Sequence, residues 1–146
     1  MAGKKPKIKN LKEIERKPKA SQSQKTNKTI CQTGNWLYFC PTEQTIRGIY
    51  EILKEQNETE IWEEAGVMEV LLGEKSSLDI ETAEIYPEDE VTQAFAKEQG
   101  ANSVFLITFV PEDYELAKKV MKQILEQFGG IFCGDTEDFM PQVRNR

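Results

Sequence analysis

Residues 103–135 read SVFLITFV, then PEDYELAKKVMKQILEQF, then GG and finally IFCGD. The first run is almost wholly apolar, which predicts a strand buried on both faces. The second run predicts an amphipathic helix, because its apolar residues recur at helical spacing. The side of this helix expected to face a sheet consists of Leu116, Ala117, Val120, Met121, Ile124, Leu125 and Phe128. Gly129 and Gly130 end the helix and a short apolar strand follows, so the stretch predicts a βαβ unit.

The residues before this stretch predict three strands and two helices. Residues 35–40 form an aromatic strand, and a helix follows with Thr42 as its N-cap. Residues 67–72 and 78–83 alternate apolar and polar side chains, which predicts an antiparallel hairpin with a polar outer face. Residues 60–64 are either an earlier part of the first hairpin strand, which we favour, or a short helical turn interrupted at Gly66. The core side of the second helix is expected at Val91, Ala94 and Phe95.

The predicted order is therefore β-α-β-β-α-β-α-β, in a single acidic domain of residues 31–146 that belongs to the α+β class. Its first six elements match the ferredoxin-like, or split βαβ, order, with a helix and a strand added. We expect a mixed sheet with helices packed on it. Pro141 argues against further regular structure after Gly134.

The net charge of −6 conceals two segments of opposite sign. Residues 1–30 hold ten Lys or Arg and two acidic residues, a balance of +8. Residues 31–146 hold 9 basic and 23 acidic residues, a balance of −14. The first segment is rich in Lys, Ser, Gln, Thr and Asn and poor in apolar residues, so we predict a basic, disordered tail.

Three roles remain open for this lysine-rich tail. It is a solvated extension, an arm that makes weak and unspecific contact with nucleic acid, or a segment that lies on the acidic domain to which it is tethered. No aromatic residue interleaves the lysines, so base stacking is not available to it.

The composition also excludes several classes of function. The chain contains no histidine, which removes the commonest general acid or base and the usual imidazole metal ligand. The phosphate-binding patterns GxxxxGK and GxGxxG are both missing. Three cysteines without a CxxC pair favour a reducing cytoplasm. No apolar run is long enough for a membrane span or a secretion signal. We therefore expect a cytoplasmic protein with no cofactor and no membrane contact.

Carboxylates are the remaining candidates for chemistry. Asp135, Glu137 and Asp138 follow a strand end, where open α/β sheets often bind ligands, and together they would suit a Mg²⁺ site for phosphate hydrolysis. The simpler interpretation is a solvated loop with Asp135 as a turn residue, because no base or lysine is fixed beside them. Cys133 has apolar neighbours in its strand and is interpreted as a packing residue.

The leading hypothesis is a non-catalytic protein-binding module, because the acidic domain would steer and capture a basic partner protein. In its charge the domain is similar to small acidic immunity or antitoxin proteins, and the basic tail departs from that pattern. The alternative is a nucleic-acid- or ribosome-associated factor tethered by the tail. The residues expected to bind the partner are Trp62, Glu63, Glu64, Asp135, Glu137 and Asp138.

Overall fold

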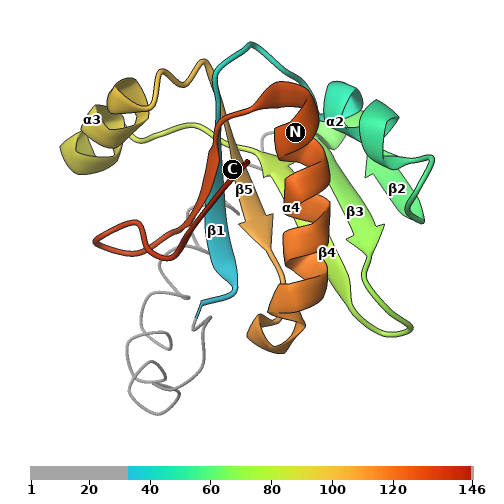
Figure 1. Cartoon of the computed structure of the whole chain (residues 1–146). Helices are drawn as coiled ribbons and strands as arrows, with labels where there is room; N and C mark the ends of the chain where they lie inside the picture. The colour runs from blue at the N-terminus through green and yellow to red at the C-terminus, as the bar shows by residue number, and fades with distance from the viewer. Residues whose placement is uncertain (1–32, 146) are drawn as a thin grey trace.

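The computed structural model describes residues 33–145 and shows an α+β domain (Figure 1). The predicted tail, residues 1–30, lies outside the described residues. The elements are β1 (Asn35–Cys40), α2 (Ile46–Leu53), β2 (Thr59–Trp62), β3 (Val67–Leu71), β4 (Ser77–Thr82), α3 (Glu90–Glu98), β5 (Ser103–Thr108), α4 (Tyr114–Phe128), β6 (Ile131–Gly134) and β7 (Gln142–Arg144), with the 3₁₀ turns η1 (Glu63–Ala65) and η2 (Pro111–Asp113).

The strands of the described chain form one seven-stranded sheet in the order β2-β3-β4-β5-β1-β6-β7. Every neighbouring pair is antiparallel, so the expectation of a mixed sheet was wrong. The ferredoxin-like order is not confirmed, because the sheet is larger than the four strands of that arrangement. The prediction of no regular structure after Gly134 was also wrong: β7 pairs with β6 just after Pro141.

The stretch that decides the fold behaves as a βαβ unit with a strand inserted. Both β5 and β6 pair with β1 in antiparallel fashion, so they run parallel to each other with β1 between them. All six residues of β1 are buried. Sequence periodicity predicts the two strands and the helix of the unit, but it carries no information on which strand lies between them.

The first face of the sheet is covered by α2 and α4, which lie in front of it in Figure 1. The two helices bury their apolar sides together with alternate residues of all the central strands. The predicted apolar side of α4 is largely confirmed, with one exception: Leu116 is 39% exposed, and Tyr114 is buried in its place. The helix after β1 begins later than expected, because Thr45 and not Thr42 accepts the capping hydrogen bond, from the backbone N–H of Gly48.

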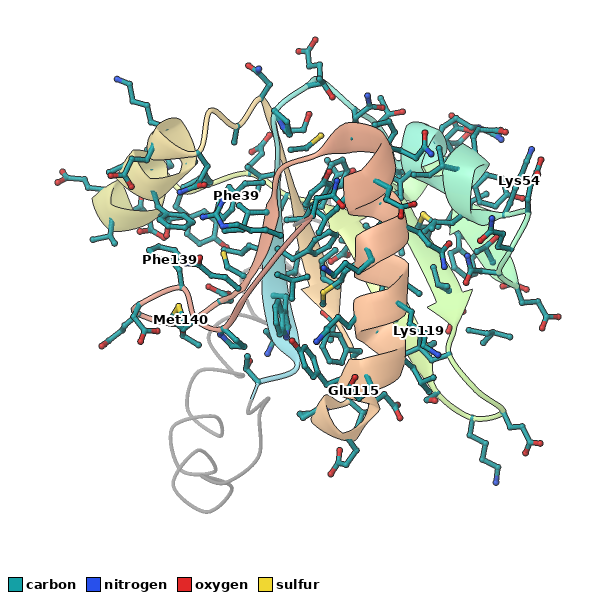
Figure 2. All side chains as sticks on the ribbon, in the orientation of Figure 1. Phe39, Lys54, Glu115, Lys119, Phe139 and Met140 are labelled. Carbon is teal, nitrogen blue, oxygen red and sulfur yellow. The ribbon has the colours of Figure 1, made fainter. Side chains whose placement is uncertain are left out.

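The second face carries a smaller core beneath α3, at one end of the sheet. There Phe95 packs edge-on against Phe39 at 5.4 Å and stacks on Phe139 at 4.1 Å between ring centroids. Figure 2 shows Phe39 and Phe139 on this side of the molecule. Val91 and Ala94 were expected in the core and are exposed, because α3 buries Thr92 and Ala96 instead.

The junction between α4 and β6 yields a test of this packing. Gly130 (φ 93°) and Gly100 (φ 68°) are both left-handed, so alanine at either position costs about 1–2 kcal/mol. Only at Gly130 would the new Cβ collide with the carbonyl oxygen of Phe39, which adds about 1–3 kcal/mol. We expect Gly130→Ala to lower the urea midpoint well below that of Gly100→Ala. Equal midpoints would contradict the described contact between this junction and β1.

Candidate functional site

The second face of β2, β3 and β4 is the part of the sheet that no described helix covers. The core beneath α3 contains no residue from these three strands. Met68, Val70, Leu78 and Ile80 point to the first face, so the alternate residues of β3 and β4 point to the second. Ile61 packs on the first core in the same way, which places Glu60 and Trp62 on the second face.

Half of the eight residues on this uncovered face are acidic, and three of these acids stand in register across the strands. Glu60 of β2 lies opposite Glu69 of β3, and Glu69 lies opposite Asp79 of β4. Glu81 follows one position along the same face of β4, opposite Val67. No lysine or arginine is among the residues of these three strands. We call Glu60, Trp62, Glu69, Asp79 and Glu81 the acidic face.

The surroundings of Asp79 raise the pKa of its carboxyl group. Asp79 is exposed, yet adjacent strands remove part of the water around its carboxylate, and this desolvation is the first cause that raises its pKa above the ordinary value. The negative charge of Glu69 raises the pKa further, and Glu81 adds a smaller contribution. A hydrogen bond from the Ser77 hydroxyl acts in the opposite direction. Like charges placed directly opposite each other destabilise a sheet.

Apolar surface borders these carboxylates. Trp62 is 48% exposed at the end of β2, and Leu71 is 43% exposed at the end of β3. Glu81 lies opposite Leu106 of β5. Leu106 lines a small hollow between the sheet and α3. Its walls include Leu37, Ile85, Tyr86, Asp89 and Thr92. Acidic and apolar side chains therefore share this surface.

The six residues predicted to bind a partner fall into two separate places. Trp62 belongs to the acidic face, and Glu63 and Glu64 follow it in η1. Glu63 is held by Arg47 of α2 at 2.9 Å. Arg47 also contacts Glu51 at 3.0 Å, so these charges are engaged within the domain.

The Asp135, Glu137 and Asp138 cluster lies at the opposite edge of the sheet, between β6 and β7. The sheet order puts five strand spacings, about 24 Å, between β2 and β6. Asp138 accepts hydrogen bonds from the Thr136 hydroxyl at 3.0 Å and the Met140 N–H at 3.2 Å. These bonds hold the loop in shape, and the structure does not bring the two predicted clusters together.

Within residues 33–145, no group of three or more His, Cys, Asp or Glu side chains is placed to hold a metal ion. Cys133 is buried, and burial raises its pKa to about 12, with the charge of Asp135 adding to the effect. Its thiol therefore stays protonated at neutral pH.

In comparisons with known proteins, no family model, no curated protein and no solved structure matches this chain. Among the helices of the described residues, none has the length and apolar character needed to cross a membrane. The function is therefore inferred from the geometry of the domain.

Sequence reasoning predicted a polar outer face for the hairpin and an acidic binding edge around residues 58–69, but it did not single out Asp79 or Glu81. The available signal was the alternation of acids with Met68, Val70, Leu78 and Ile80. What alternation cannot supply is the register of β2 against β3, which brings Glu60 opposite Glu69.

Removing one carboxylate from the row should stabilise the protein. We expect Glu69→Gln to raise the free energy of unfolding at pH 7 by about 0.2–1 kcal/mol, measured by urea unfolding. Because the folded pKa of Asp79 is raised, its ionised form opposes folding above that pKa, and the penalty disappears as pH falls below its unfolded pKa. The gain from Glu69→Gln should therefore shrink at acidic pH.

Glu115→Gln is the matched control for this measurement. Glu115 lies in the first turn of α4, on the helix-covered side of the sheet (Figure 2), where a negative charge favours the helix. Its removal changes the net charge equally but should lower the stability slightly. A loss of stability in Glu69→Gln, or a gain that does not depend on pH, would contradict the described register.

Proposed function

We propose that this protein is a non-catalytic binding module that captures a basic protein segment on the acidic face. The observation that carries this proposal is the row formed by Glu60, Glu69 and Asp79 across three adjacent strands. Such a row costs stability in the free protein, and a cationic partner would relieve that cost. The exposed ring of Trp62 beside the row adds a surface suited to cation–π contact with Lys or Arg.

The proposed partner is a protein segment in which basic residues are combined with apolar ones. The carboxylates repeat at the spacing between strands, about 4.8 Å, so a segment crossing the strands meets one after another. Leu71 and the hollow at Leu106 offer apolar contact at the border of the row. An acidic immunity or antitoxin role, in which the module neutralises a basic protein, is the concrete form of this proposal. The alternative, nucleic-acid or ribosome association through residues 1–30, concerns residues that the structure does not describe.

Binding of an oligolysine peptide tests the proposal. We expect Glu69→Gln/Asp79→Asn to weaken this binding roughly 2- to 30-fold, because each exposed ion pair contributes about 0.2–1 kcal/mol. Binding by the unmodified chain should also weaken as salt is added. The emission of Trp62 reports the contact, since Trp36 is fully buried.

Glu115→Gln/Glu126→Gln is the control, because it removes two charges from α4 on the covered face and should leave the affinity unchanged. Equal weakening in the two double variants would show that oligolysine responds to the net charge alone, and it would contradict a specific binding face.

A further inference from the structure

The described chain begins between the acidic face and the loop of residues 135–138, because β1 lies between β5 and β6. Asn35, the first residue of β1, lies opposite Thr108, and Thr108 lies opposite Asp79. The start of β1 therefore belongs to the same cross-strand row as Asp79, Glu69 and Glu60. At about 4.8 Å per strand, Asn35 lies about 10 Å from Asp79 and about 19 Å from Glu60.

The lysine-rich residues 1–30 precede this point by a few residues only. The position of the chain is set from Thr33 onward, so the reach is counted from that residue. An extended chain covers about 3.3–3.6 Å per residue, which gives Lys28, five residues earlier, a backbone reach of about 17–18 Å and gives Lys25 about 26–29 Å. The backbone of Lys28 can therefore extend as far as Asp79, and that of Lys25 can extend across the whole row. Covalent attachment also gives the segment an effective concentration in the millimolar range.

We propose that residues 1–30 occupy the acidic face of their own chain and compete there with the basic partner. This inference rests on the proposed function, because it assigns a second occupant to the same surface. The charges are complementary: +8 for residues 1–30 against −14 for residues 31–146. Ile8, Leu11 and Ile14 lie among the lysines and match the apolar border at Trp62 and Leu71. Occupancy lowers the apparent affinity for a partner by the fraction of molecules in which the face is open.

The cluster at residues 135–138 lies nearer to the start of β1, since the Asp135 N–H donates to the Asn35 carbonyl oxygen at 2.9 Å, but it is the poorer match for this segment. Asp138 already accepts two hydrogen bonds within its own loop. The acidic face instead offers successive carboxylates across β2, β3 and β4, strands that contain no basic residue. The experiment must distinguish contact of residues 1–30 with the acidic face from contact with residues 135–138.

A spin label in the full chain tests the contact. The label is attached at Ser23→Cys in a Cys31→Ser background, and Cys40 and Cys133 are protected from labelling by burial. We expect broadening of the amide resonances of Glu69 and Asp79 that is lost in Glu69→Gln/Asp79→Asn and at high salt. Broadening confined to the start of β1 or to residues 135–138, unchanged by these substitutions, would overturn the proposal.

Oligolysine binding separates this inference from the proposed function. Lys19→Gln/Lys25→Gln/Lys28→Gln should bind oligolysine roughly 3-fold more tightly or better, because three competing ion pairs are lost. If its affinity equals that of the unmodified chain while Glu69→Gln/Asp79→Asn still binds more weakly, the inference fails and the proposed function stands. If the label shows the contact but oligolysine binds none of the variants, the inference stands and the proposed function fails.

Discussion

The structure depends on the two-residue alternation of an antiparallel sheet whose faces are unequally covered. On the first face, α2 and α4 bury alternate residues of the central strands. On the second face, α3 covers only the end of the sheet near Phe39. The remaining second face of β2, β3 and β4 contacts solvent or a partner, so its residues need not be apolar.

The functional argument rests on the residues that occupy the second face of β2, β3 and β4. A solvated sheet face is stable with mixed charges, and cross-strand pairs of opposite sign would stabilise it. This chain instead places Glu60, Glu69 and Asp79 directly opposite one another, with Glu81 beside them. Desolvation between the strands raises the pKa of Asp79, and the charge of Glu69 raises it further. Acidic residues at these positions lower the stability of the folded protein and increase its attraction for cations. A surface that has evolved for binding is expected to lose stability in this way.

The sequence predicted strands and helices well where the residues of an element determine its structure by themselves. Apolar runs and helical spacing predicted β1, β5, α4 and β6 close to their observed bounds, and Gly129 and Gly130 mark the end of α4. The errors arose where pairing between segments distant in the sequence determines the structure. The insertion of β1 between β5 and β6 made the sheet antiparallel, and pairing with β6 created β7 in a segment with little strand signal of its own. For the same reason, the sequence indicated Trp62 and the acidic stretch that ends at Glu69, whereas the alignment of Glu60, Glu69 and Asp79 needed the strand register.

The central claim is that the second face of β2, β3 and β4 is the surface that binds cations on a protein partner. Chemical-shift mapping of the ¹⁵N-labelled full chain with oligolysine tests it most directly. The account predicts the largest amide shifts at Glu60, Glu69, Asp79 and Glu81, with little change along α4 at Glu115 and Lys119, which Figure 2 places on the helix-covered side. Shifts centred on Asp135, Glu137 and Asp138, or spread evenly over both faces, would contradict it.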